Sequence, residues 1–141
     1  MHIKIFPGVA DFIKSIGEDY RVAIGSGALR KEIEGILISV GLESYFEFIV
    51  SANEVEKCKP DPEVYMKVLG IFNQDSDNVI SPDECVVFED AQHGIDAAKS
   101  AGMNCIAVTN SNPEADIKGA DYIINSFDEI DLSKVNSLFS S

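Results

Sequence analysis

The sequence predicts an α/β fold in which a parallel β-sheet is covered by helices on both faces. Short β-branched apolar runs alternate along the chain with longer stretches of helical periodicity. The chain has 141 residues, enough for one domain with its own core. No internal repeat, low-complexity tract or interior linker divides it, so residues 1–141 are expected to form a single domain.

The first half of the chain is predicted to contain three helices and two strands. Apolar residues at helical spacing indicate the helices, and short apolar runs indicate the strands. Gly41 stands where a C-terminal cap belongs, and Pro60 and Pro62 precede the third helix. In chain order we expect a helix from 9 to about 19, a strand over 21–25, a helix over 29–40, a strand over 48–50 and a helix over 62–72.

The second half continues the alternation. We expect a strand over 84–88, a helix over 91–101, a strand over 104–108, a short helix over 115–119, a strand over 122–124 and a helix over 132–139. Strands that alternate with helices form right-handed βαβ crossovers, which is why the sheet is predicted to be parallel.

Composition narrows the classes of partner and compartment. The formal net charge of −13 argues against nucleic acid and anionic membrane surfaces as partners. No apolar stretch is long enough to span a bilayer, and the N-terminus does not resemble a signal peptide. The three cysteines form no CxxC pair, which favours a reducing cytoplasmic location over a zinc or disulfide framework.

Two adjacent carboxylates, Glu89 and Asp90, follow the apolar run 86–88. In open α/β sheets, ligands bind at the carboxyl ends of the strands. Two neighbouring acids there repel each other unless a cation lies between them, and their oxygen ligands suit Mg²⁺. The alternative is that one acid simply caps the following helix.

Two further strand ends carry groups that suit a phosphate. Ser26 follows the strand over 21–25, and its hydroxyl together with the N–H groups of Gly27 and Ala28 is expected to cradle a phosphate. Lys59 lies in a loop that two prolines stiffen, so it is a candidate to neutralise the phosphate and the acidic pair. Taken singly, each residue favours a simpler interpretation, Ser26 as a helix cap and Lys59 as an exposed surface lysine.

These motifs, in this order, resemble the haloacid dehalogenase-like hydrolase superfamily, specifically its β-phosphoglucomutase-like phosphatase branch. The resemblance extends from about Phe6 to Ile124 and implies a three-layer, Rossmann-like core. It also implies that Ser26 binds the transferring phosphoryl group, that Lys59 binds phosphate, and that Asp90 binds Mg²⁺ with Glu89 acting at the metal. The matching segments are 6–9, 24–27, 41–46, 59–65, 87–90 and 94–103.

The chain also departs from that pattern. Complete members of the family begin with a strand ending in Asp-x-Asp, followed by a helical cap that selects the substrate. Here the acids that precede Ser26 are Asp11, Glu18 and Asp19, which fall on or at the end of the first predicted helix. We therefore expect a truncated core without the nucleophile and the cap, and little or no turnover by this chain alone.

The absent strand has a structural consequence. In the family it lies between the strand that ends at Ser26 and the strand that ends at Glu89, so its loss leaves two open inner edges. We expect either an oligomer or strand complementation at these edges, or a placement of the β-prone residues 2–6 beside residues 22–24.

The resemblance implies Mg²⁺-dependent phosphoryl transfer from a small phosphorylated metabolite, through an aspartyl-phosphate in complete members. Two alternatives stay open. One is a non-catalytic module that binds phosphate and Mg²⁺ or another protein. The other is a phosphorelay receiver domain, which is disfavoured because the adjacent acids here come late, after Lys59.

Overall fold

The computed structural model describes residues 8–17, 19–74, 77–109 and 116–139 of the chain. Five α-helices and five strands lie in these ranges, together with short 3₁₀ turns. In chain order they are α1 (Val9–Ile16), β1 (Ile24–Gly25), α2 (Arg30–Val40), η1 (Glu43–Tyr45), β2 (Ile49–Val50), η2 (Ala52–Glu54), α3 (Glu63–Phe72), η3 (Pro82–Glu84), β3 (Val86–Glu89), α4 (Gln92–Ser100), β4 (Asn104–Val108), β5 (Tyr122–Ile124), η5 (Phe127–Glu129) and α5 (Leu132–Phe139).

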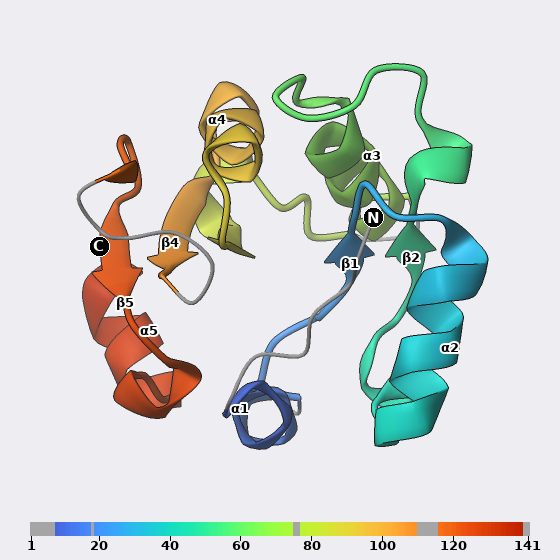
Figure 1. Ribbon diagram of the computed structural model, residues 1–141. Coiled ribbons are helices and arrows are strands. Elements are labelled where there is room, and N and C mark those ends of the chain that lie inside the picture. The colour runs from blue at the N-terminus through green and yellow to red at the C-terminus, as the bar shows by residue number, and fades with distance from the viewer. Residues whose placement is uncertain (1–7, 18, 75–76, 110–115, 140–141) are drawn as a thin grey trace.

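The strands form two separate parallel sheets. One sheet pairs β1 with β2, and the other has the order β3-β4-β5 (Figure 1). Parallel pairing confirms that part of the prediction, and no ladder joins β1 to β3 in the described residues. The break falls between the strands that end at Gly25 and Glu89, where open inner edges were expected.

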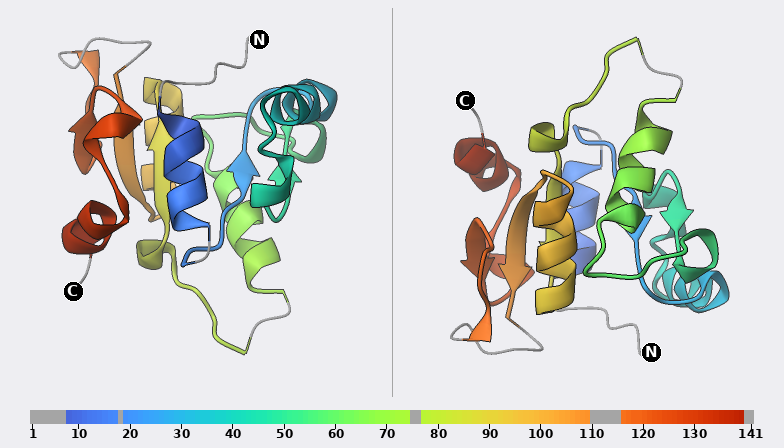
Figure 2. Two further views of the ribbon diagram at one scale, coloured as in Figure 1. Left: turned by 90° about the horizontal axis from the view of Figure 1, so that it is seen from below. Right: turned by 90° about the horizontal axis from the view of Figure 1, so that it is seen from above.

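Helices cover both faces of the strands. In Figure 1, α3 and α4 lie above the strands, and α1 and α5 lie below them. Figure 2 shows α1 between the two groups of strands, beside the break in the sheet. Residues along β4 alternate between the two layers: Cys105 and Ala107 pack under α4, while Ile106 and Val108 pack with α1 and α5. This period of two is the expected pattern for a sheet buried on both faces.

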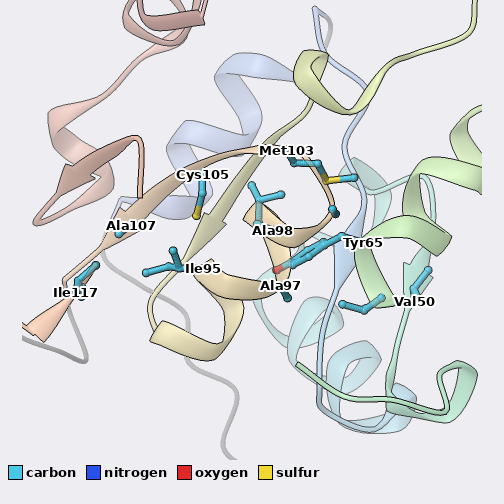
Figure 3. Packing of buried hydrophobic residues seen from close by; sticks show 12 residues of the cluster. Val50, Tyr65, Ile95, Ala97, Ala98, Met103, Cys105, Ala107 and Ile117 are labelled. Atoms are coloured by element: carbon cyan, nitrogen blue, oxygen red, sulfur yellow. The ribbon is translucent and has the colours of Figure 1, made fainter. Parts of the chain in front are cut away.

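Small residues on α4 bring that helix close to the strands. Ala97 and Ala98 are fully buried beside Cys105, and the ring of Tyr65 reaches toward them from α3 (Figure 3). On the opposite face, the rings of Phe12, Phe88 and Phe127 pack against one another in edge-on and tilted arrangements. Each layer therefore has its own apolar cluster, and the strands separate the two clusters.

Several predicted elements match the structure closely. The strands β4 and β5 and the helix α5 have the predicted bounds, and Gly41 caps α2 with φ of 71°. Helix α1 ends at Ile16 instead of Asp19, and β3 starts two residues late because η3 occupies Pro82–Glu84. The capping box of Ser81 and Glu84 stabilises that turn at the expense of the strand.

Two expectations fall outside what the structure describes. Residues 2–6, proposed to lie beside 22–24, are not among the described residues, and the predicted helix over 115–119 is described only from 116 onward. The expectation of an oligomer remains a prediction. Within the described ranges, none of the helices has the length and apolar character needed to cross a bilayer.

The buried Cys105 gives a prediction for alkaline pH. Burial, with the nearby Glu89 carboxylate, raises the pKa of the Cys105 thiol from 9.0 to about 12. Between these values the unfolded chain loses the thiol proton while the folded chain keeps it, so the free energy of unfolding falls as pH rises. This thiol contributes a slope of up to roughly 1.4 kcal/mol per pH unit. We expect Cys105→Ala to flatten the dependence in urea titrations at pH 9 to 12.

The exposed Cys58 provides the matched control. The Cys58→Ala variant should retain the slope of the unmodified protein. An unchanged slope in Cys105→Ala would show that the thiol at this position does not titrate as its burial requires.

Candidate functional site

The predicted site residues gather where β1 and β3 end. Ser26 directly follows β1, Glu89 is the last residue of β3, and Asp90 follows it. Lys59 reaches the same place from the loop that precedes α3. The carboxyl ends of two different sheets thus contribute to one cluster of polar groups, as expected for a ligand site in a parallel α/β fold.

Lys59 links the two sheets through its ammonium group. Its Nζ lies 2.5 Å from Glu89 Oε2 and 3.3 Å from the carbonyl oxygen of Gly25. The same ammonium lies 5.0 Å from the centre of the Tyr65 ring, a cation–π distance. Only 19% of the Lys59 side chain is exposed. The lysine is therefore a constrained cation inside the site and not the exposed surface lysine of the alternative interpretation.

The loop that carries Lys59 is fixed by its own hydrogen bonds. The N–H of Asp61 donates to the carbonyl of Cys58 at 3.0 Å and closes a turn around Lys59 and Pro60. The Asp61 carboxylate then accepts the N–H of Glu63, at the first turn of α3, at 3.0 Å. Because Asp61 ties the loop to the first residue of α3, Lys59 is positioned by the packing of α3 against β1 and β2.

Glu89 is buried beneath α3 and α4, with 8% of the residue exposed. The hydroxyl of Tyr65 donates to the same carboxylate oxygen, Oε2, that Lys59 contacts. Burial and the neighbouring Glu89 charge raise the pKa of Tyr65 well above its usual range, so the hydroxyl remains a proton donor. A charged carboxylate is tolerated here because an ammonium and a hydroxyl both bind it.

Gly94 on α4 makes room for that carboxylate. A Cβ at this position would lie 2.0 Å from both Cδ and Oε1 of Glu89, far inside van der Waals contact. The first turn of α4 therefore approaches the acid closely only because residue 94 has no side chain. Tyr65 and Gly94 thus hold Glu89 in place from two helices.

The turn after β1 holds Ser26 in a different way from the predicted cradle. The N–H of Ser26 donates to the carbonyl of Val50 at 3.0 Å, which continues the ladder with β2. The N–H of Ala28 donates to Ser26 Oγ at 3.1 Å. In this structure that amide is bonded to the serine oxygen, and the use of the Gly27 and Ala28 amides for phosphate stays a prediction.

The start of α2 also lies later than expected. The helix begins at Arg30, and the N–H of Arg30 donates to Asn53 Oδ1 at 2.8 Å. The Ser26 hydroxyl and the amides of Gly27 and Ala28 remain the candidate phosphate donors of this turn, and Ser26 lines the same cavity as Glu89 and Asp90.

The acidic pair does not by itself make up a metal site in the described part of the chain. Glu89 is engaged by Lys59 and Tyr65, whereas Asp90 lies one residue further along and lines the cavity. Among the described residues, no three His, Cys, Asp or Glu side chains are grouped so that they would hold a metal ion. The oxygen chemistry of Asp90 suits Mg²⁺, but the ligand set that these residues supply is incomplete.

The structure brings together Ser26, Lys59, Glu89 and Asp90, as the sequence predicted. It places Asp11 in the first turn of α1, exposed, which agrees with the expectation that this acid does not reach the sheet edge. Sequence reasoning missed Tyr65 and Gly94. The only signal for them was their place inside the segments 59–65 and 94–103 that carry the family resemblance.

The sequence and structure match those of known hydrolases. A profile of the family described as "Haloacid dehalogenase-like hydrolase" matches residues 1–108. A "Putative phosphatase YhcW" of Bacillus subtilis is 37% identical over 111 residues, covering 76% of this chain and 46% of the relative. A "Phosphorylated carbohydrates phosphatase" of Thermotoga maritima is 36% identical over 107 residues, covering 74% and 46%.

Solved structures agree with this match. The structure of CbbY from Rhodobacter sphaeroides in complex with phosphate superposes with a TM-score of 0.82 at 26% identity, covering 93% of this chain and 58% of that one. A putative β-phosphoglucomutase from Thermotoga maritima gives a TM-score of 0.74 at 31% identity, covering 86% and 56%. The chain spans about half the length of the curated relatives that it matches.

The close contact between Gly94 and Glu89 predicts that a methyl group added at residue 94 destabilises the fold. Gly94→Ala should lower the free energy of unfolding by about 1–3 kcal/mol, because the Glu89 carboxylate or α4 must move. Gly35→Ala is the matched control, since a Cβ there meets no atom within 4 Å in the exposed part of α2. That control should gain about 0.5–1 kcal/mol. Urea unfolding midpoints measure both, and equal midpoints for the two variants would contradict the contact.

The ion pair of Lys59 and Glu89 predicts a difference in stability between two variants. Lys59→Met leaves the Glu89 charge buried without its cation and should cost about 3–5 kcal/mol of unfolding free energy. Adding Glu89→Gln should recover much of that loss, because the amide is neutral and still accepts the Tyr65 hydroxyl.

The pair of Lys67 and Glu63, 3.3 Å apart, is more exposed than Lys59 and Glu89 and provides the control. Lys67→Met should change the free energy of unfolding by less than about 1 kcal/mol. Chemical denaturation of the three variants measures the coupling. A double variant as unstable as Lys59→Met alone would show that Lys59 and Glu89 do not depend on each other.

Proposed function

We propose that this protein takes part in the transfer of phosphoryl groups from small phosphorylated metabolites. The chain belongs to the haloacid dehalogenase-like hydrolase family and to its β-phosphoglucomutase-like phosphatases. Sugar phosphates are the proposed substrate class. Similar proteins include the Thermotoga maritima phosphatase of phosphorylated carbohydrates and an Escherichia coli "Fructose-1-phosphate phosphatase YqaB", which is 34% identical over 100 residues.

The observation that carries this proposal is the position of Lys59. Its ammonium lies between the Gly25 carbonyl, one residue before Ser26, and the Glu89 carboxylate, one residue before Asp90. In a protein of net charge −13, an anionic substrate needs a local cation to offset the repulsive field. Lys59 supplies that charge beside the Ser26 hydroxyl, so both are proposed to hold the oxygens of the phosphoryl group.

Asp90 is proposed as a ligand of Mg²⁺, on which members of the family typically depend. When bound, the cation neutralises charge on the transferring group. Glu89 is proposed to act mainly through Lys59, because its described contacts hold that ammonium in place. Water molecules and oxygen atoms of the substrate are proposed to complete its ligand set, since Mg²⁺ commonly binds through one or two carboxylates.

The nucleophile is proposed to come from elsewhere in the protein. The family resemblance implies an aspartate that accepts the phosphoryl group, and Asp11 is exposed on α1. The 141 residues are therefore proposed to bind phosphate but to turn over poorly when isolated. A binding module is the second candidate function, and the open cavity between β1 and β3 is the observation that favours it.

Binding and turnover give separate tests. Titration of the 141-residue chain with inorganic phosphate, with and without Mg²⁺, should show binding by ³¹P NMR. Ser26→Ala and Lys59→Ala should each weaken it by about tenfold or more, since each removes a direct contact worth roughly 1.4 kcal/mol. Lys67→Ala should bind as the unmodified chain does, because that lysine pairs with Glu63 on α3.

Hydrolysis of fructose 1-phosphate by the same samples tests the nucleophile. We expect turnover below about 1% of the ~10 s⁻¹ of a typical enzyme. Turnover within tenfold of that value would contradict an external nucleophile. The site would be contradicted if the unmodified chain did not bind phosphate, or if Ser26→Ala and Lys59→Ala bound it as tightly as the unmodified chain does.

A further inference from the structure

Tyr65 contacts the ends of both sheets from the first turn of α3. Only 6% of the residue is exposed, and its ring packs so closely on β1 that a Cβ at Gly25 would lie 3.1 Å from the ring carbon Cε1. Its hydroxyl reaches Glu89, the last residue of β3. The ring extends from α3 toward the small residues Ala97 and Ala98 of α4 (Figure 3). One buried side chain therefore spans the break between the two sheets at the candidate site.

The Lys59 ammonium lies against this tyrosine. Its Nζ is 5.0 Å from the centre of the Tyr65 ring, 2.5 Å from Glu89 Oε2 and 3.3 Å from the carbonyl oxygen of Gly25. An ammonium group has three N–H donors, so its two acceptors among the described residues leave one donor for a phosphate oxygen. The strength with which Glu89 attracts the ammonium therefore affects how well Lys59 binds an anion.

The Tyr65 hydroxyl and the Lys59 ammonium bind the same atom, Oε2 of Glu89. A hydroxyl that donates to a carboxylate takes up part of its negative charge, and in a buried site that charge acts strongly on its neighbours. Without the hydroxyl, Oε2 would attract the ammonium more strongly, and the carboxylate would repel an incoming anion more strongly. Both changes oppose the binding of phosphate by Lys59.

We propose that Tyr65 is a positioning residue of the phosphate site, whose hydroxyl shares Glu89 Oε2 with Lys59 and so leaves the ammonium available to a phosphoryl oxygen. This inference rests on the proposed function, because it takes Lys59 as the phosphate ligand. Tyr65 acts through its neighbours, since its described contacts are with the Glu89 carboxylate, the Lys59 ammonium and the backbone at Gly25.

A pair of tyrosine variants tests the role of the hydroxyl. Tyr65→Phe removes the hydroxyl and keeps the ring that packs on Gly25. Tyr122→Phe is the matched control, because Tyr122 begins β5, away from the candidate site, and also has a lysine over its ring, with Lys134 Nζ 5.3 Å from the ring centre. Titration with inorganic phosphate in the absence of Mg²⁺, followed by ³¹P NMR, measures the affinity. Circular dichroism confirms that both variants fold.

We expect Tyr65→Phe to bind phosphate about fivefold or more weakly than the unmodified chain, a coupling of the size found within one hydrogen-bond network. Tyr122→Phe should bind phosphate as the unmodified chain does. Unchanged affinity in Tyr65→Phe would overturn the proposal, and so would an equal loss in the two variants.

A second background tests whether the effect depends on the Glu89 charge. In Glu89→Gln the shared oxygen belongs to a neutral amide, so the hydroxyl no longer offsets a carboxylate charge. Adding Tyr65→Phe to Glu89→Gln should therefore change phosphate affinity by less than about twofold. If the hydroxyl only supported the packing of α3, its loss would weaken binding as much in this background, and that result would overturn the proposal.

The ammonium group itself gives a spectroscopic readout. Heteronuclear NMR follows the exchange of the Lys59 ammonium protons with water, and Lys59→Ala identifies the signal by its loss. Because Glu89 is expected to hold the ammonium more tightly in Tyr65→Phe, exchange should slow by about twofold or more. Unchanged or faster exchange would indicate a site that is merely loosened and would overturn the proposal.

Failure of this proposal is distinguishable from failure of the proposed function. If the unmodified chain does not bind phosphate, the proposed function fails and the assignment of Tyr65 fails with it. If the unmodified chain binds phosphate and Lys59→Ala weakens that binding, but Tyr65→Phe does not, the proposed function stands and the role of Tyr65 alone is overturned.

Discussion

The contact between Lys59 and Glu89 holds the two halves of this molecule in one arrangement. Lys59 precedes α3, which packs on β1 and β2, and Glu89 ends β3 in the other sheet. Backbone ladders stop at the break between β1 and β3 in the described residues, so side chains connect the halves there. The Tyr65 hydroxyl strengthens the link, because it reaches Glu89 from α3 as well.

A buried ion pair of this kind is costly to form, since both charges lose water. It is accommodated here because three neighbouring residues suit the carboxylate. Lys59 supplies the counter-charge, Tyr65 supplies a hydroxyl, and Gly94 allows α4 to close over the acid without displacing it. Packing and charge therefore both stabilise this cluster, and together they hold the Lys59 ammonium in the candidate site.

The sequence predicted the elements with strong local signals. Strands β4 and β5 were found to the residue, because their apolar runs are bounded by Gly102 and by polar turns. Chain order also predicted that Ser26, Lys59 and Asp90 would meet, since parallel strands end on one side.

The features that the sequence did not predict arise from contacts between elements that are far apart in the chain. Tyr65 looked like another apolar residue of its helix, because its hydroxyl finds Glu89 only after α3 packs. Gly94 looked like an ordinary helix residue until the closeness of α4 to Glu89 was known.

The geometry of the candidate site depends on the break in the sheet. Ser26 belongs to the sheet of β1 and β2, whereas Asp90 follows a strand of the other sheet, so the distance between them depends on how the two sheets are held together. Lys59 contacts both strand ends, through the Gly25 carbonyl and the Glu89 carboxylate. This lysine therefore constrains the separation of the two strand ends at which the predicted site residues gather.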